Sequence, residues 1–241
     1  MRQWKARIYQ EGDETGIIDL MNLVFQQTNH DMEFWSWKYK TAPRGFLTVV
    51  SDDHGKIVGH MGLQLMDIKV GNKIITGSQA CDLCVHPDYL RQGMFLTMGK
   101  TIMKKAKDEK VSLTYGFPTD PAYYGHTKYG WFDVSEIPVL VTYFDTHRAV
   151  EGDFQRLKRM EPILKRTAKY LDWFFSIWRQ HAVTSIENIE ITQVSCFDRE
   201  IDRIWNEVST GYGIILVRDH RYLNWRYFAD RNSTRLNSIH T

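Results

Sequence analysis

The sequence predicts a mixed α/β (α+β) domain over residues 1–145, followed by part of a second domain. Three observations predict this fold class. A strand and an amphipathic helix open the chain, two long strand-like segments joined by a tight turn follow, and a second amphipathic helix comes after them. The length of 241 residues agrees, because it exceeds one domain of about 150 residues without reaching two.

The first predicted elements are a strand at Ile8-Tyr9 and a helix over Glu14–Gln27. Gly12 and Asp13 form the turn between them, and the Asp13 carboxylate is placed to cap the helix. Apolar residues of this helix recur at a spacing of three or four, as on one buried face. They are Ile17, Leu20, Met21, Val24 and Phe25.

Three strands are predicted next. Phe46–Val50 is rich in β-branched residues, Lys56–Val70 is long and strand-like, and Ile74–Val85 returns beside it. Asp52-Asp53-His54-Gly55 and Val70-Gly71-Asn72-Lys73 have turn chemistry and connect the three strands as hairpins.

The remainder of the first domain is predicted to contain two helices and further strands. A loop over Pro87–Gly93 leads into a helix over Met94–Lys107, which is amphipathic. A strand over Val111–Phe117, a loop with a short helix over Pro118–His126 and closing strands over Trp131–Phe144 complete the domain.

The chain changes character after residue 145. We interpret residues 146–185, which are polar and basic and then rich in aromatic residues, as a linker and a packing helix. Residues 186–231 would begin a second domain, with a helix that Asp198 caps and a strand over Ile214–Val217. Residues 232–241 are polar and aperiodic, and we interpret them as a non-native tail.

An internal duplication would explain the second domain. Trp37-Lys38-Tyr39 and Trp225-Arg226-Tyr227 share an aromatic-basic-aromatic pattern, and each follows a predicted helix. The pattern is short for a repeat, but it predicts that the second domain resembles the first. The second copy would be incomplete, since the first continues for about a hundred residues after its own triplet.

Composition argues against several classes of function. With 31 Lys+Arg and 29 Asp+Glu the formal net charge is +2, so the chain lacks the strong basic excess of a nucleic-acid-binding protein. No stretch reaches the ~18 apolar residues of a membrane span, and the N-terminus lacks the apolar core of a signal peptide. Three cysteines are too few for a disulfide framework. We therefore expect a cytoplasmic protein without nucleic-acid or membrane partners.

An anion site is predicted where the strand ending at Val85 passes through a polar turn into the helix that begins at Met94. Backbone N–H groups at the start of a helix lack internal acceptors, and the helix dipole is positive there. Such a site suits a pyrophosphate. Gly93 allows the ligand to approach the backbone closely, and Arg91 adds a positive charge.

The same segment resembles motif A of the GNAT acyltransferase superfamily, V-x-P-x-Y-R-x-Q/K-G-x-G/A, which binds the pyrophosphate of acetyl-CoA. The matching residues are Val85, Pro87, Tyr89, Gln92 and Gly93.

Two further segments support the resemblance, which covers roughly residues 6–145. Val58-Gly59-His60 lies in the preceding hairpin, and Lys128-Tyr129-Gly130-Trp131 is similar to the family's K-x-G-F. The sequence departs from the family pattern at Leu90, where Arg is common, and at Phe95, where Gly or Ala is preferred.

The resemblance implies a mostly antiparallel, twisted sheet flanked by helices, and an N-acetyltransferase that moves an acetyl group from acetyl-CoA directly to a primary amine. The strands Gln79–Val85 and Val111–Phe117 would splay apart around the thioester. The acceptor stays open between a small-molecule amine, an amino sugar and a protein lysine, and the oligomeric state is not predicted. The implied cofactor-binding residues are Leu83, Val85, Arg91, Gln92, Gly93, Met94, Phe95 and Thr119.

Acyl transfer needs a base for the amine, a donor to the thioester carbonyl and a proton for the leaving thiolate. We expect Asp82 to be the base, since similar enzymes carry a carboxylate on this strand. A backbone N–H between Leu83 and Val85 would polarise the carbonyl. Tyr124 is the first candidate for the acid, and His126, which occupies the family's tyrosine position, is the second.

A metal site and two other functions are also considered. Cys81 and Cys84 are three apart on a predicted strand, so their side chains should point to opposite faces and share no metal ion. The main alternative function is a catalytically inactive CoA-binding or scaffolding domain of a tandem protein. Aminoacyl transfer from charged tRNA is a third, and it would require a basic groove.

Overall fold

The computed structural model describes residues 3–26, 29–137 and 192–229. The chain forms two units, one from residues 1–132 with 194–241 and one from residues 133–193. Of the second unit, residues 133–137 and 192–193 are described, and they belong to no helix or strand. The elements below all lie in the first unit.

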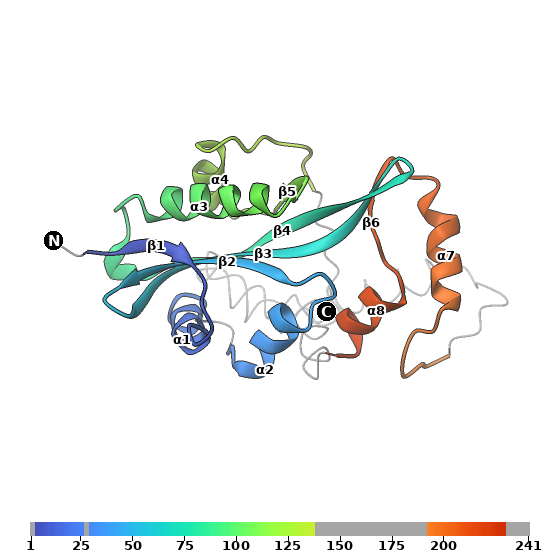
Figure 1. The fold of residues 1–241 in the computed structure, drawn as a ribbon, viewed down its shortest axis with the longest axis horizontal. Helices are drawn as coiled ribbons and strands as arrows, with labels where there is room; N and C mark the ends of the chain where they lie inside the picture. Colours follow the sequence, from blue (N-terminus) through green and yellow to red (C-terminus); the bar gives the residue numbers. More distant parts are fainter. Residues whose placement is uncertain (1–2, 27–28, 138–191, 230–241) are drawn as a thin grey trace, which may run out of the picture. The chain divides into compact units, whose positions relative to one another are not determined.

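One six-stranded sheet forms the centre of this unit, in the order β1-β2-β3-β4-β5, with β6 paired to β3 (Figure 1). Only the β4–β5 pairing is parallel, so the predicted, mostly antiparallel sheet is confirmed. The strands are β1 (Lys5–Ile8), β2 (Phe46–Asp53), β3 (Lys56–Val70), β4 (Lys73–Val85), β5 (Leu113–Tyr115) and β6 (Ile214–Leu216).

Helices cover both faces of the sheet (Figure 1). On one face lie α3 (Met94–Asp108) and α4 (Asp120–Thr127). On the other lie α1 (Glu14–Val24), α2 (Met32–Trp35), the π-helical turn η1 (Ser36–Lys40) and α8 (His220–Tyr227). The 3₁₀ turn η2 (Pro87–Tyr89) precedes α3, and α7 (Glu200–Ser209) precedes β6. No helix in the described ranges is long and apolar enough to cross a membrane.

Among the described residues, the two larger core clusters lie one against each face of the sheet, and a smaller third cluster contains Trp37, Ala42 and Trp225. Ile17 and Met21 of α1 pack with Trp35 and Tyr39. Under α3, a second cluster contains Val49, Val58, Leu63, Met94, Met98 and Ile102. Val49 and Val50 fall in different clusters, as the alternation of side chains along β2 requires.

Several predicted boundaries are wrong. The first helix ends at Val24 rather than Gln27, and Asp13 precedes it without capping it. The Asp13 carboxylate instead accepts two bonds of 2.7 Å from the guanidinium of Arg7, because a paired charge binds it more strongly than a helical N–H. Residues 131–137 form no strand, although strands were expected there. Residues 138–144 lie outside the described residues.

The expectation that Cys81 and Cys84 point to opposite faces is also wrong. Both contact the cluster under α1, because one extra residue of β4 lies between the pairs His60↔Cys84 and Gly62↔Cys81. This β-bulge reverses the alternation of side chains at Asp82, whose φ is 50°. Among the described residues no group of three or more His, Cys, Asp or Glu side chains could hold a metal ion.

The C-terminal segment packs directly on the first hundred residues. β6 extends the edge of β3 from Ile68 to Val70, beyond the part of that edge that β2 occupies. The indole N–H of Trp37 donates to the carbonyl of Trp225 at 2.9 Å, and that of Trp225 donates to the carbonyl of Trp37 at 2.8 Å. Their rings stack 5.6 Å apart at 16°.

The two predicted triplets therefore contact each other at equivalent atoms. That relation fits a duplication, and the incomplete second domain over residues 186–231 stays a prediction. The linker and helix over residues 146–185 and the tail over 232–241 lie outside the described residues.

We expect Trp225→Ala to lower the free energy of unfolding by about 3–5 kcal/mol, because it removes a large buried side chain that stacks and hydrogen-bonds. Trp225→Phe keeps an aromatic ring and loses only the indole N–H, so it should lower the free energy of unfolding by less. Urea denaturation followed by circular dichroism measures both. A loss below about 1 kcal/mol for Trp225→Ala, the size of one hydrogen bond, would contradict the structural importance of this pair.

Candidate active site

The parallel strands β4 and β5 separate at one end of their short pairing. Pairing runs from Gly77↔Leu113 to Gln79↔Tyr115 and then stops. Beyond it a pocket opens, with residues 80–83 on one wall and residues 116–119 on the other. The predicted splay of the two strands is therefore confirmed.

This pocket reaches both faces of the sheet. Its residues Met61, Ala80 and Leu83 belong to the core under α3, whereas Phe25 and Cys81 pack with the core under α1. Ala122 and His126 of α4 complete the lining. Two reactants could therefore enter from opposite faces and meet between the strands.

The carboxylate of Asp82 is the charged group of this pocket. The bulge turns it toward η1, where Lys38 Nζ donates to Oδ1 at 2.8 Å and the Tyr39 hydroxyl donates to Oδ2. The side chain is 14% exposed. Burial by itself would raise the Asp82 pKa, but Lys38 and Tyr39 outweigh burial and hold that pKa below its ordinary value. Asp82 is therefore an ionised carboxylate at neutral pH.

Three partners of Asp82 were not among the predicted site residues. Burial lowers the pKa of Lys38, but the charge of Asp82 outweighs it, so the Lys38 pKa is raised. Burial and Asp82 raise the pKa of Tyr39 well above its ordinary value. His60 Nδ1 donates to the Asp82 carbonyl at 2.7 Å, and burial lowers the His60 pKa to about 4. The only signals in the sequence were the triplet around Lys38 and the Val58-Gly59-His60 match.

The start of α3 has the features of the predicted anion site. Gly93 is the N-cap residue with φ 76°, and Arg91 also has a positive φ of 62°. Backbone N–H groups from Arg91 to Leu96 find no acceptor in the described part of the chain. A Cβ added at Gly93 would meet no atom within 4 Å, so the space beside this glycine is open.

The other residues predicted at this site differ in their surroundings. Met94 is buried in the core, and Gln92 accepts a hydrogen bond from the Trp4 indole at 3.2 Å. Phe95 turns toward α4, where its ring centroid lies 5.2 Å from that of His126. A Cβ on Gly125 would approach the Phe95 ring to 2.4 Å, so glycine is required at that position.

The two candidates for the acid are placed very differently. Tyr124 is 68% exposed and is not part of the pocket lining. His126 is 7% exposed, lines the pocket, and shares a hydrogen bond between its Nδ1 and the Tyr129 hydroxyl. Burial lowers the pKa of His126, so its imidazole is neutral at neutral pH. Thr119, at the N-cap of α4, lines the same pocket.

The structure thus brings four of the predicted residues together in one pocket and separates others from it. Those that line the pocket are Asp82, Leu83, Thr119 and His126. Val85 ends β4 just before η2, and residues 91–95 form the separate site at the start of α3.

Comparison with known proteins identifies the fold. Residues 5–132 of the 241 match the family model described as "Acetyltransferase (GNAT) domain". Among curated proteins, none matches the sequence.

Similar solved structures include an acetyltransferase of Trypanosoma brucei, with 16% identity over 58% of this chain and 100% of that chain, at a TM-score of 0.48. The glucosamine-6-phosphate N-acetyltransferase of Arabidopsis thaliana shows 14% identity over 59% of this chain and 99% of its own chain, at a TM-score of 0.47. A predicted acetyltransferase of Clostridium acetobutylicum, solved with acetyl-CoA, shows 14% identity over 58% of this chain and 96% of that chain, at a TM-score of 0.48. Because the family model covers more than half of the residues, the chain belongs to the GNAT acetyltransferase family.

Proposed function

We propose that the protein transfers an acetyl group from acetyl-CoA to a primary amine by direct attack of the amine on the thioester. The pocket that passes through the sheet between the separated strands β4 and β5 carries this proposal. It connects the α3–α4 face, which holds the anion site, with the α1–α2 face, which holds Asp82 and Lys38.

Acetyl-CoA would bind on the α3–α4 face. The free backbone N–H groups from Arg91 to Leu96 would hold the pyrophosphate, with Gly93 giving room and Arg91 adding charge. Thr119 would bind the pantetheine arm. The bulge interrupts the hydrogen-bond ladder of β4 next to Leu83, so a backbone N–H between Leu83 and Val85 would be available to polarise the thioester carbonyl.

The acceptor amine would enter from the α1–α2 face. Asp82 is ionised, so its carboxylate would attract the ammonium form of the amine and take its proton, directly or through water. The neutral nitrogen then attacks the carbonyl carbon, a C–N bond forms, and the C–S bond breaks. The nitrogen loses its second proton, and the thiolate of CoA must gain one.

His126 is the donor that the pocket favours for the thiolate. It lines the pocket, whereas Tyr124 is exposed outside it. Because its imidazole is neutral, His126 would first take the second proton that the amine nitrogen loses and would then pass that proton, as imidazolium, to sulfur. We therefore propose His126 ahead of Tyr124.

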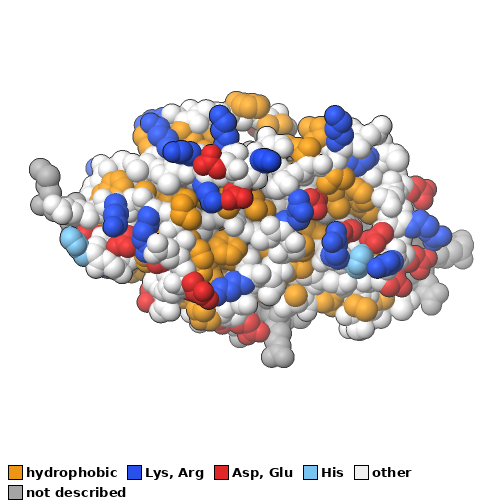
Figure 2. All heavy atoms as spheres, viewed as in Figure 1, with side chains coloured by type: hydrophobic (Ala, Val, Ile, Leu, Met, Phe, Trp, Pro, Cys, Tyr) orange, Lys and Arg blue, Asp and Glu red, His pale blue; other side chains and the backbone are white. Residues whose placement is uncertain are grey.

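The alternative of aminoacyl transfer from tRNA finds no support on the face drawn in Figure 2. Lys and Arg side chains there are interspersed with Asp and Glu rather than collected into one basic surface. The alternative of an inactive binding domain predicts acetyl-CoA binding without turnover.

Calorimetry tests the cofactor site. We expect acetyl-CoA to bind saturably to the protein and to bind at least about tenfold more weakly to Gly93→Trp, because the indole would occupy the open space beside Gly93, next to the free N–H groups. Gly55→Trp is the matched control, since Gly55 also has a positive φ and open space and lies in the β2–β3 turn. Equal affinity in all three proteins would rule out this site.

Release of free CoA thiol tests the catalytic roles. We expect Asp82→Asn and His126→Gln each to lower turnover by about 10²–10⁴-fold, the usual contribution of a general base or acid, while acetyl-CoA binding is kept. Tyr124→Phe should have the activity of the parent, because its hydroxyl lies outside the pocket. Normal turnover in Asp82→Asn would remove that residue from the mechanism. A loss of turnover in Tyr124→Phe, with normal turnover in His126→Gln, would assign the acid role to Tyr124.

A further inference from the structure

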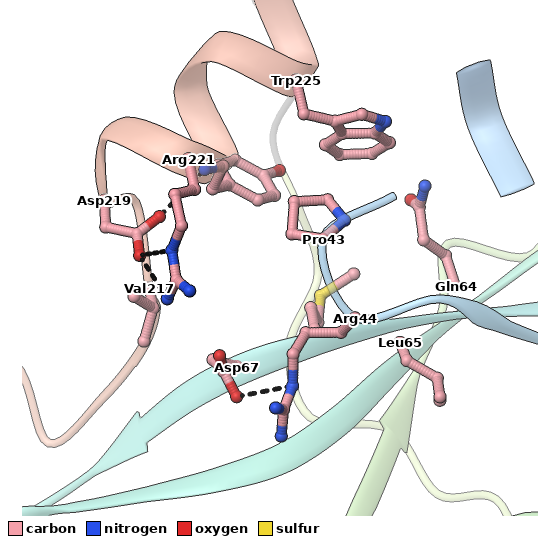
Figure 3. A pocket seen from close by; sticks show the side chains of 11 residues that line it. Pro43, Arg44, Gln64, Leu65, Asp67, Val217, Asp219, Arg221 and Trp225 are labelled. Atoms are coloured by element: carbon pink, nitrogen blue, oxygen red, sulfur yellow. Dashed lines mark hydrogen bonds and ion pairs between the residues drawn. The ribbon is translucent and has the colours of Figure 1, made fainter. Parts of the chain in front are cut away.

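A second pocket lies at the edge of β3, between the start of β2 and the end of β6 (Figure 3). β2 pairs with β3 as far as Gln64, and β6 begins to pair at Ile68. Residues 65–67 of β3 therefore have no strand from the described part of the chain beside them on this edge. The pocket has a volume of about 90 Å³, below the ~300–1,000 Å³ of sites that enclose a drug-sized ligand, so a ligand here would be only partly enclosed.

The walls of this pocket come from distant parts of the chain. Pro43 and Arg44 precede β2, Gln64 and Asp67 belong to β3, and Arg221 and Trp225 belong to α8. In Figure 3 the Trp225 ring lies above Pro43, with the two arginines at the sides of the hollow. The pocket therefore exists only when the C-terminal segment is packed on the sheet.

The polar groups of the pocket are matched in charge and keep spare hydrogen-bonding capacity. Arg44 pairs with Asp67 at 3.0 Å and bonds Thr76 with one terminal nitrogen, which leaves the other terminal nitrogen available. Arg221 gives Nε and one terminal nitrogen to Asp219, at 3.1 and 3.0 Å. With two arginines and two aspartates the pocket has no net charge, so it does not select a strongly charged ligand.

The backbone adds one donor and one acceptor. Leu65 N–H donates to Gly45 and the Asp67 carbonyl accepts from Val217, so both residues direct their backbone groups toward this edge. The Leu65 carbonyl and the Asp67 N–H on the same edge have no partner in the described ranges. A gap this short leaves no room for a peptide strand, but it offers alternating donor and acceptor groups to a small molecule.

These features fit a carbohydrate ring. Sugar hydroxyls donate and accept at once, which suits free guanidinium nitrogens beside backbone and carboxylate acceptors. The C–H face of the ring suits an apolar wall, which the exposed Pro43 supplies, because Trp225 is 7% exposed and its ring already stacks on that of Trp37. An aliphatic amine would leave most of these polar groups unpaired.

The pocket is next to the proposed site of acetyl transfer. Gln64, in its wall, donates from Nε2 to the Lys38 carbonyl at 3.0 Å, and Lys38 is the ion-pair partner of Asp82. Met66, also in the wall, accepts a hydrogen bond from Tyr115 at 3.1 Å, and Tyr115 is the last paired residue of β5 before the strands separate.

We infer that this pocket binds the sugar ring of the acceptor, so that the substrate class is an amino sugar. The assignment of the sugar as acceptor rests on the proposed function, since its amine must reach Asp82. The binding of the sugar ring in this pocket does not depend on that function. The residues that determine specificity would be Arg44, Asp67, Asp219 and Arg221.

Binding in the absence of acetyl-CoA tests the pocket. The probes are D-glucosamine, methyl α-D-glucopyranoside, which has the ring without the amine, and 1,5-diaminopentane, which has amines without a ring. Saturation-transfer NMR should show both sugars binding and competing. The double variant Arg44→Ala/Arg221→Ala should bind each sugar about tenfold more weakly than the parent, as expected for two lost hydrogen bonds. Arg203→Ala, which removes an exposed ion pair on α7, should bind them like the parent.

The outcomes separate this inference from the proposed function. No binding of either sugar to the parent, or equal binding in the double variant and the parent, overturns the sugar pocket, even if diaminopentane is acetylated. Sugar binding that the double variant weakens supports the pocket even if no amine releases CoA thiol, a result that would instead overturn acetyl transfer. Urea unfolding of the double variant confirms that it is folded, as the exposure of both arginines predicts.

Discussion

The ion pair between Lys38 and Asp82 is the interaction on which the site depends. A nearly enclosed carboxylate is stable only when it is paired and hydrogen-bonded, and removal of one partner leaves an uncompensated charge. Lys38 and Tyr39 supply that pairing from η1, while His60 holds the Asp82 backbone from β3. Asp82 lies at the β-bulge, next to the point where β4 separates from β5. The electrostatics that stabilise the bulge therefore also place a negative charge in the gap between the strands.

This arrangement extends to the C-terminal segment through the residue next to Lys38. Trp37 exchanges hydrogen bonds with Trp225, so α8 supports η1. β6 and α8 then occupy the part of the β3 edge that β2 leaves open, and the second pocket forms in the remaining gap. The proposed acceptor site thus includes residues of α8, which begins about 150 positions after the end of β3 in the sequence.

Local patterns predicted much of the fold, and long-range contacts explain the errors. The hairpin of β3 and β4 was predicted almost to the residue, because the alternating segments and the turn between them are adjacent in sequence. The anion site at the start of α3 was predicted from the strand-turn-helix pattern, and Asp82 from the resemblance to the family. Asp13 was misjudged because its partner Arg7 lies on another element. The prediction that Cys81 and Cys84 point to opposite faces was wrong because a β-bulge depends on the register between two strands. It cannot be recognised from the sequence of one strand.

By itself, the sequence determined the order of most strands and helices, the glycine turn before α3 and membership in the GNAT family, because these depend on periodicity and on motifs of a few consecutive residues. Only the tertiary structure decided that Asp82 pairs with Lys38, that His126 rather than Tyr124 lines the pocket, and that α8 completes a second pocket. Each of these depends on which side chains meet across the sheet. Trp37 and Trp225 are 188 residues apart, and only the packed sheet brings them together.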